Sequence, residues 1–449
     1  MRLELHNINK IKHASIKIGG LTLIAGNNDS GKSTVGKMLF SLVKAISQQG
    51  EDIEESVEKE VFYLIEKLFF LLRRREDNIK HLQFKNLFFP PSFFEQIREC
   101  NVFSESLFGV DKEKLEELFR LRREFLIGQY SLFETEEDRT IVILNQIEYL
   151  CLSPKRNPEE AFMNALKKVI YSEFQSKICS DNTEMSSLSF SVGQRNTLHV
   201  EFLDNNIHYS DIEGELIRPF DDITFVETPL YLQLTYMLEQ AQTLLDEDEG
   251  SRRFRPKVSF HIKDLINKVG LSKYSSGNES SEYLEYINQI IGGRFVYDKK
   301  SSQYLFIKGE GSPLHISNVA SGIKSFGLIQ LLLQVNELNE QKMLVIDEPE
   351  NHLHPEWQLK FAHLIVLLVK ANIPILLSTH SPYFIQAIKV YAQREGISPL
   401  VEYYLAEEDS KDENGAPMTT IHHVTDDLNR IFRKLAEPMH EIMRMNHDS

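Results

Sequence analysis

Apolar residues recur with two different periods along the chain, and these periods divide it into segments. In the first 45 residues, alternating apolar positions predict one strand at Leu3–Ile8 and a second around Ile16 and Ile18. The fully apolar run Leu21–Ala25 predicts a buried third strand, and Val35–Ala45 predicts a helix. A glycine-rich turn joins the last two, so the segment has the strand–turn–helix order of an α/β unit.

Helical spacing replaces this alternation from about residue 51. Apolar residues three or four positions apart lie among Glu and Lys, at Val57, Val61, Leu64, Leu68 and Leu72. A second such pattern covers Lys112–Tyr130, and Asn157, Pro158 and two glutamates have the order of an N-cap, a first-turn proline and a first-turn acidic pair. We therefore expect residues 46–186 to form a large, mostly helical insertion.

Strands return after this insertion. Alternating residues separated by turns predict an antiparallel β-meander, with strands at Leu188–Val192, Leu198–Phe202 and Ile207–Tyr209. A helix is expected at Leu230–Leu245, and the acidic stretch Asp246–Pro256 after it is expected to be an exposed linker. The meander region spans residues 187–236, and residues 237–295 are expected to form a smaller helical insertion that contains the linker.

In the last third of the chain, residues 296–449, strands and helices alternate. Short helices and strands are expected at Arg294–Tyr297, Tyr304–Lys308 and His315–Ser317, followed by a long helix after Gly322. The elements after that helix are expected at Met343–Ile346, Pro355–Lys370, Ile373–Ser378, Pro382–Ala392, Val401–Leu405, Thr419–Val424 and Asp427–Met445. This alternation is typical of a parallel sheet with right-handed crossovers. The predicted class is therefore α/β, with a mixed central sheet, an antiparallel meander and a helical insertion.

The turn between the third strand and the first helix has the phosphate-binding pattern GxxxxGK[ST]. Its residues, with the one that follows, are Gly26, Asn27, Asn28, Asp29, Ser30, Gly31, Lys32, Ser33 and Thr34. Glycines let successive backbone N–H groups surround a phosphate, and the positive end of the helix dipole adds to the attraction. Lys32 is predicted to reach the β- and γ-phosphate oxygens, and the Ser33 hydroxyl to bind Mg²⁺. The cofactors expected are therefore ATP and Mg²⁺.

Two later strands end in polar residues that suit the same chemistry. Asp347 and Glu348 follow the strand Met343–Ile346; Asp347 is predicted to hold Mg²⁺ and Glu348 to deprotonate the attacking water. His380 follows Ile373–Ser378, one crossover later, where it can hydrogen-bond the γ-phosphate or the water. Glu348 and His380 are therefore the candidate catalytic residues.

Ser321 and Gly322 open the long helix that precedes the Asp347 strand, with Lys324 in its first turn. A serine and a glycine at a helix N-terminus can bind an anion through a hydroxyl and exposed N–H groups. A Ser-Gly pair is by itself a common way for a helix to begin. Its interpretation as an anion site depends on its position just before the strand that ends in Asp347 and Glu348.

This order of motifs resembles the heads of ABC-type ATPases, and most closely the OLD/RecF/SMC-like AAA-family ATPases. The stretch from Asp347 through Glu350 to Pro355 looks like the DEPE-N-x-LHP stretch of the OLD-like branch. The resemblance implies that two subunits sandwich ATP, with Gly26–Thr34 of one chain facing Ser321 and Gly322 of the other. It also implies a homodimer, or a larger oligomer built from dimers, and an ATPase as in antiphage defence systems of the PARIS, Septu or retron-linked kind.

Under this resemblance the ATPase head comprises residues 1–45, 187–236 and 296–449, interrupted by the two insertions. Three departures from the family pattern stand out. Ile323 replaces the second glycine of the signature, and the Q-loop position has no plain glutamine, with Glu227 the nearest candidate. Only a short segment follows His380, too short for the Toprim nuclease of OLD proteins. We therefore expect an ATPase without its own nuclease domain, working with a separate effector such as a nuclease or toxin.

Composition narrows the class of protein further. The chain has 449 residues, 42% of them apolar and 26% charged, which is the balance of a folded protein of two or three domains. Three cysteines without a CxxC pair make a disulfide scaffold or zinc ribbon unexpected. His352, His354 and His363 lack the spacing of a zinc site. No signal-peptide core or apolar run of about 18 residues occurs, so a cytoplasmic protein without membrane spans is expected.

The formal net charge of −16 argues against a protein that coats nucleic acid or an anionic membrane. Local basic runs at Arg73–Arg75, Arg120–Arg123 and Arg252–Lys257 keep DNA as a possible partner; solvated helix faces and a linker are the plainer interpretation. The phenylalanines between Phe69 and Phe94 fit either a core or a partner surface. A RecF/SMC-like repair ATPase in which ATP gates DNA binding therefore remains the main alternative. The motor subunit of a transporter is a weaker one.

Overall fold

The computed structural model describes most of the chain. The described residues are 1–47, 61–62, 64–72, 87–100, 102, 111–130, 139–152, 158–175, 177–180, 185–193, 196–213, 218–232, 258–273, 282–298, 303–309, 311–351, 353–412 and 415–447. Its contacts divide it into two compact units, Met1–Ser47 with Leu166–Ser449, and Gln48–Ala165. Among the described residues, no helix is both long enough and apolar enough to cross a bilayer.

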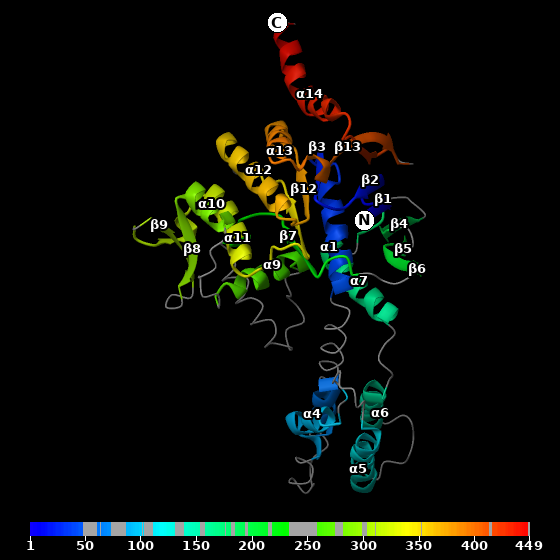
Figure 1. Ribbon diagram of the computed structural model, residues 1–449. Coiled ribbons are helices and arrows are strands. Elements are labelled where there is room, and N and C mark those ends of the chain that lie inside the picture. Colours follow the sequence, from blue (N-terminus) through cyan, green and yellow to red (C-terminus); the bar gives the residue numbers. More distant parts are fainter. Residues whose placement is uncertain are drawn as a thin grey trace. The chain divides into compact units, whose positions relative to one another are not determined.

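The first unit is built on one eleven-stranded sheet (Figure 1). Its strands are β1 (Arg2–Ile8), β2 (Ile11–Lys17), β3 (Leu21–Gly26), β4 (Ser186–Val192), β5 (Asn196–Leu203), β6 (Asn206–Glu213), β7 (Asp222–Val226), β11 (Lys342–Asp347), β12 (Ile375–Thr379), β13 (Val401–Lys411) and β14 (Pro417–His423). They lie in the order β6-β5-β4-β1-β2-β14-β13-β3-β12-β11-β7. The strands from β13 to β7 are parallel, and those from β6 to β2 are antiparallel. The predicted α/β class is confirmed.

The meander joins the sheet directly, because β4 pairs with β1 at its edge. β13, near the end of the chain, lies beside β3 and completes its hydrogen bonding on that side. β3 is therefore central, with β12 on its other side, and all six of its residues are buried. A strand paired and packed on both sides is expected to be apolar throughout, as Leu21–Gly26 nearly is.

Helices cover both faces of the parallel strands. They are α1 (Lys32–Ser47), α11 (Ser321–Gln334), α12 (Pro355–Lys370), α13 (Pro382–Arg394) and α14 (Leu428–His447). Alternate strand residues such as Leu23, Leu344 and Leu377 pack with apolar residues of α11 to α14. The residues that alternate with these point to the other face of the sheet, toward α1. An added Cβ at Gly36 of α1 would lie 3.1 Å from Val345 on that face. α1, which begins inside the phosphate-binding pattern, therefore packs closely on the sheet.

A buried ionic cluster fastens α1 to its neighbours. Lys44 of α1 lies 2.5 Å from Asp222 of β7 and 2.7 Å from Asp264 of α9 (Phe260–Leu271). Lys268 of α9 bridges the same two carboxylates at 2.8 and 3.0 Å. Burial raises the pKa of Asp222, but the two lysines outweigh this effect and lower it. Removing one member of such a buried pair leaves an uncompensated charge, so the cluster holds α1, α9 and β7 in one arrangement.

A second, three-stranded sheet packs on α11. Its strands are β8 (Gly293–Asp298), β9 (Gln303–Lys308) and β10 (Leu314–His315), and α10 (Glu282–Ile291) precedes them. The short element expected at His315–Ser317 contains the end of β10 and the start of a 3-10 helix. The His315 side chain accepts a hydrogen bond from the Ser317 N–H, which turns Ile316–Asn318 into a 3-10 helix.

The second unit is helical where the structure describes it. Its helices include α4 (Pro90–Arg98), α5 (Lys112–Tyr130) and α6 (Arg139–Leu152), and α7 (Pro158–Phe174) begins in it. Its core contains Phe88, Phe93 and Phe119, so part of the phenylalanine-rich segment is core, although Phe70 is 55% exposed. The helical character predicted for this region is what the described residues show.

The basic run Arg120–Arg123 forms the solvated face expected of it only in part, because Arg120 is exposed but Arg122 is not. Arg122 is 1% exposed and lies over the Phe93 ring at 3.7 Å, and its guanidinium donates to the carbonyls of Leu87 and Leu118 and to the Gln96 side chain. Arg123 pairs with Glu148, and Arg120 lies near two glutamates of its own helix. The run therefore offers no free set of cations for a phosphate backbone. The other two basic runs lie outside the described residues.

We expect Gly327→Ala to destabilise the first unit. An added Cβ at this α11 position would lie 2.1 Å from the Phe295 ring of β8. Overpacking of this kind costs about 1–3 kcal/mol, and thermal unfolding followed by circular dichroism measures it. Gly128→Ala in α5, with no atom within 4 Å of the new Cβ, is the matched control. A Gly327→Ala protein as stable as the control would contradict this packing.

Candidate functional site

The loop with the phosphate-binding sequence pattern, named the phosphate-binding loop after this pattern, lies between β3 and α1. Gly31 has φ of +79°, and a Cβ there would lie 2.9 Å from Ile11 of β2. At Gly26 a Cβ would lie 2.9 Å from the carbonyl oxygen of Ala406. Both glycines are therefore required by the shape of the loop, which leaves no room for side chains where the backbone turns.

Lys32 lies inside this loop rather than on the surface. Its side chain is almost fully buried, and its ammonium donates to the carbonyl oxygens of Gly26 at 3.0 Å and Asn27 at 2.7 Å. Glu348 Oε1 is 3.5 Å from the same Nζ. The Ser30 hydroxyl also donates to the Asn27 carbonyl, which braces the loop. A buried cation held between carbonyls and one carboxylate is a fixed positive charge, suited to an anionic ligand.

Asp347 ends β11 opposite the loop. Its carboxylate accepts hydrogen bonds from the hydroxyls of Ser33 and Ser378. Burial raises its pKa, as do the nearby carboxylates, and the two hydroxyls counteract the increase. The structure thus brings together Ser33 and Asp347, the two residues predicted to hold the metal. A hydroxyl and a carboxylate oxygen are the kinds of ligand that Mg²⁺ takes in proteins.

Glu348 stands beside Asp347 in a left-handed backbone conformation, with φ of +47°. Its amide donates to the Ser378 carbonyl oxygen at 3.1 Å, and its carboxylate accepts from the Asn351 amide at 2.9 Å. Burial raises the pKa of Glu348, but Asn351, Lys32 and His380 outweigh that and lower it. A non-glycine residue held at positive φ is costly and clusters at functional sites. The lowered pKa keeps the carboxylate ionised at neutral pH.

His380 follows β12 and closes the site on one side. Its Nδ1 is 3.4 Å from Glu348 Oε1 and 3.3 Å from Glu350 Oε1, both within ion-pair distance. The side chain is 37% exposed, so its other edge remains open to solvent. The two predicted catalytic residues thus lie next to each other.

Glu350 is a site residue that motif reasoning did not single out. It is 4% exposed, and its Oε1 accepts hydrogen bonds from the Thr379 hydroxyl at 2.6 Å and from the backbone N–H groups of His380 at 2.7 Å and Ser381 at 3.2 Å. Three donors on one oxygen fix the loop that carries His380. The glutamate is visible in the sequence, three positions after Asp347, but its partners lie about 30 residues away and give no local signal.

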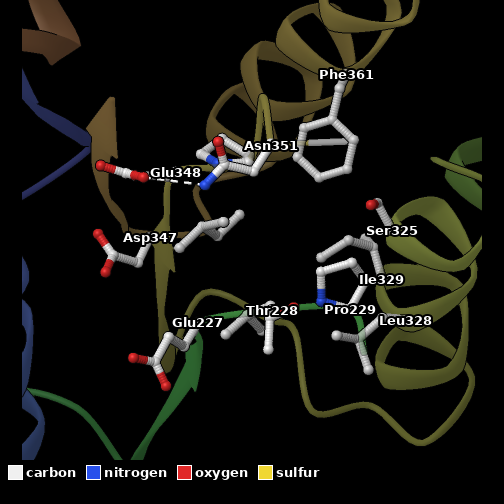
Figure 2. A pocket seen from close by; sticks show the side chains of 13 residues that line it. Glu227, Thr228, Pro229, Ser325, Leu328, Ile329, Asp347, Glu348, Asn351 and Phe361 are labelled. Atoms are coloured by element: carbon white, nitrogen blue, oxygen red, sulfur yellow. Dashed lines mark hydrogen bonds between the residues drawn. The ribbon is translucent and has the colours of Figure 1, made fainter. Parts of the chain in front are cut away.

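Glu227, the candidate at the Q-loop position, follows β7 and lies near the acidic strand end. Figure 2 shows it with Asp347 and Glu348 around a pocket that Pro229, Leu328 and other apolar residues also line. A hydrogen bond from His261 is the largest influence on its carboxylate; this bond and one from Tyr231 lower the pKa of Glu227 to about 2. An ionised carboxylate therefore occupies this position instead of an amide.

The predicted site residues at the start of α11 do not line the hollow that contains most of the other predicted residues. Ser321 is exposed, and Gly322 packs so closely that a Cβ would lie 3.2 Å from Leu353 and 3.3 Å from Trp357. Lys324 is 6% exposed, and burial lowers its pKa. Within one chain these three residues are not part of the hollow beside the phosphate-binding loop. Of the three, Ser321 is the one presented at the surface.

An open hollow of about 350 Å³ lies at the phosphate-binding loop. Its lining includes Asn28 to Thr34 together with Asp347 and Glu348. Asn9 and Lys10, from the turn between β1 and β2, also line it and were not predicted. Lys10 forms an ion pair with Asp29. The size is that of a pocket for a ligand such as a nucleotide.

The residues present fit ATP with Mg²⁺. The loop residues Asn28–Thr34 line an open hollow, Lys32 supplies a buried cation, and Ser33 with Asp347 supplies oxygen ligands. Among the described residues, no group of three or more His, Cys, Asp or Glu is placed to hold a different metal ion. His354 caps α12 instead, and His363 stacks on Tyr391; His352 lies outside the described residues.

The sequence matches the protein family described as "AAA ATPase domain" over residues 1–385. The chain belongs to this AAA ATPase domain family. The match spans the phosphate-binding loop, the helical unit, the acidic strand and His380, and it confirms the AAA-family relationship that the motifs predict.

Individual relatives match over shorter stretches. The Septu protein PtuA of Bacillus thuringiensis is 30% identical over 110 residues, which are 22% of this chain and 27% of PtuA. The uncharacterized protein MJ1542 of Methanocaldococcus jannaschii is 22% identical over 189 residues, 42% of this chain and 21% of that protein. The matched stretches thus span only about a quarter of each relative's length.

Solved structures with a similar arrangement include SMC head domains. The SMC head domain from Thermotoga maritima is 12% identical, with 94% of this chain and 98% of that chain covered and a TM-score of 0.37. A second SMC head, bound to the C-winged helix domain of ScpA, is 10% identical, with 95% and 98% covered and a TM-score of 0.42. Scores of this size describe a loose likeness of fold.

We expect Glu350→Ala to destabilise the His380 loop. It leaves the Thr379 hydroxyl and the His380 backbone N–H without their acceptor, at a cost of about 1–3 kcal/mol for each buried group left unpaired. The Ser381 N–H keeps a second acceptor, the Thr379 hydroxyl oxygen. Glu350→Gln, which keeps one acceptor oxygen, is the matched comparison and should lose less. Hydrogen exchange of the 379–381 amides measures the effect; equal protection in both variants would show that Glu350 does not hold the loop.

Proposed function

We propose that this AAA ATPase domain protein binds ATP with Mg²⁺ in the hollow at Gly26–Thr34 and hydrolyses it. The observation that carries the proposal is that two groups meet at Glu348 Oε1: Lys32 Nζ lies 3.5 Å from this oxygen and His380 Nδ1 lies 3.4 Å from it. These three side chains come from three different strand ends, and each suits one part of phosphoryl transfer to water. A chance glycine-rich turn would not bring an ionised carboxylate and a histidine to its lysine.

The roles follow from the geometry. The backbone of the loop and Lys32 bind the phosphates, and Ser33 with Asp347 would hold Mg²⁺, which supplies neutralising charge on the β- and γ-phosphate oxygens. Glu348 takes the proton of the attacking water; its ionised carboxylate lies beside Lys32 and His380, next to the hollow. His380, placed by Glu350, orients this water or the γ-phosphate.

We further propose that heads pair when ATP is bound, with Ser321 and Gly322 of one chain against the phosphate-binding loop of another. The resemblance to ABC-type heads motivates this arrangement. The exposed Ser321 at the N-terminus of the 14-residue helix α11 supports it, because such an end attracts phosphate oxygens. Lys324 is buried in one chain, so its part in the contact rests on the resemblance alone.

The biological setting that we propose is antiphage defence, with the nucleotide state controlling a separate effector protein. The similarity to the Septu protein PtuA supports it. The alternative of an ATPase that gates DNA gains nothing from Arg120–Arg123, whose members are buried or close to acids. A protein effector is therefore the partner that we favour.

Glu348→Gln should abolish turnover while ATP binding persists. Loss of a general base lowers kcat by about 10²–10⁴-fold, and phosphate release measures it. The variant should accumulate as ATP-bound pairs on size exclusion with light scattering, and adding Ser321→Arg should prevent the pairs. Glu356→Gln, an exposed acid of α12, is the control and should behave as wild type. Wild-type turnover in Glu348→Gln would refute the assigned base.

The defence role is tested in cells. The native gene set should protect its host from at least one phage, and Glu348→Gln in the same set should remove that protection as measured by plaque counts. Protection that is unchanged in Glu348→Gln, when the purified variant hydrolyses no ATP, would refute control of the effector by hydrolysis.

A further inference from the structure

A buried histidine near the site is held between two carboxylates. His261, the second residue of α9, is 1% exposed. Its Nδ1 lies 2.6 Å from Glu173 Oε2, and its Nε2 lies 3.3 Å from Glu227 Oε2. A carboxylate only accepts hydrogen bonds, so both ring nitrogens must carry a proton for both contacts to form. His261 is therefore a cation that bridges two anions.

The Glu173 carboxylate contacts both the ring and the backbone of His261. Its Oε2 meets the ring, and its Oε1 accepts the backbone N–H of His261 at 2.9 Å. Ser259, at the N-cap of α9, makes no side-chain capping bond, so the carboxylate from α7 takes that role. The Glu173 side chain is fully buried. A shift of α7 would therefore carry the start of α9 and the His261 ring with it.

Glu227 is the other end of the chain of contacts. It follows β7 and lines the pocket that Asp347 and Glu348 also line (Figure 2). The Tyr231 hydroxyl donates to the same Oε2 at 2.8 Å. One tyrosine and one histidine thus hold the Glu227 carboxylate. Of these two, His261 connects Glu227 to Glu173 of α7.

α7 is the helix by which the chain returns from the second unit to the first. Residues 158–165 belong to the second unit and the rest of the helix to the first. Glu173 lies roughly two turns, or about 12 Å, beyond Ala165 along one continuous helix. Glu173 therefore stands on the same continuous helix as the α7 residues that belong to the second unit.

We propose that Glu173, through His261, is a positioning residue that sets the Glu227 carboxylate beside the catalytic acids, so that α7 controls the rate of ATP hydrolysis. The inference rests on the proposed ATPase function. A positioning role for Glu173 and His261 requires that the charge of His261 affects turnover. A purely structural role would require only the shape of its ring.

The charge of His261 has a definite pH dependence. Burial lowers its pKa, but Glu173 and Glu227 outweigh that and raise it above the ordinary value. Tyr231 and, at longer range, Lys37 also act on Glu227, while the rings of Phe40 and Phe225 pack on the imidazole without charge. The bridge is therefore present below about pH 6.5 and is lost as pH rises through the raised pKa. Turnover should decline along that alkaline limb.

Glu173→Gln tests the proposal in the full-length protein. The amide still caps α9 with its oxygen, but it donates toward the ring and leaves His261 neutral. We expect kcat to fall about tenfold with KM for ATP changed less than about twofold, and the alkaline limb of the kcat–pH profile to move to lower pH. His261→Gln should give the same fall, and the double variant should be no worse than either, because both act through Glu227.

Glu402→Gln is the matched control. Glu402 is likewise a mostly buried carboxylate that contacts a histidine, His423, but it lies at the start of β13, in register with Thr22 and away from the strand ends of the site. It should leave kcat and its pH profile unchanged. Wild-type kcat and an unmoved alkaline limb in folded Glu173→Gln would overturn the proposal; if that variant does not fold, the same result in His261→Gln would do so. A wild-type protein without ATPase activity would instead overturn the proposed function.

Discussion

The parallel register of β3, β12 and β11 is the constraint on which the site depends. Ala25 lies opposite Thr379, and Ser378 lies opposite Asp347, so the three strands end at one edge of the sheet. The phosphate-binding loop, His380 and the acidic pair follow these ends directly. Side chains separated by more than 300 residues therefore meet without any long loop having to reach across.

Acidic side chains outnumber basic ones at this edge of the sheet. Asp347, Glu348, Glu350 and Glu227 lie near one buried lysine, Lys32. Such a set would repel a nucleotide on its own, which makes Mg²⁺ and the backbone N–H groups of the loop essential to binding. The formal net charge of −16 thus says little about affinity for ATP, since the binding groups are local and mostly uncharged.

The elements and motifs of the first unit could be predicted from the sequence because each depends on neighbours within one strand or helix. The apolar run Leu21–Ala25 and the proline that opens α12 at Pro355 are examples. The meeting of Glu350 with Thr379, or of Glu173 with His261, depends on contacts between distant segments, and no period in the sequence encodes them. The burial of Arg122 was missed for a related reason: a run of arginines indicates a solvated face unless aromatic rings and carbonyls enclose one member.

Binding of ATP to the loop is the central claim, and titration calorimetry of wild type and Lys32→Met with ATP, with and without Mg²⁺, tests it most directly. The variant removes the buried cation and keeps an unbranched side chain of similar length. We predict Mg²⁺-dependent binding to wild type, and a loss of about a hundredfold or more in the variant, since the buried charge has no replacement. Equal affinity in the two proteins, or no binding to wild type, would contradict the account.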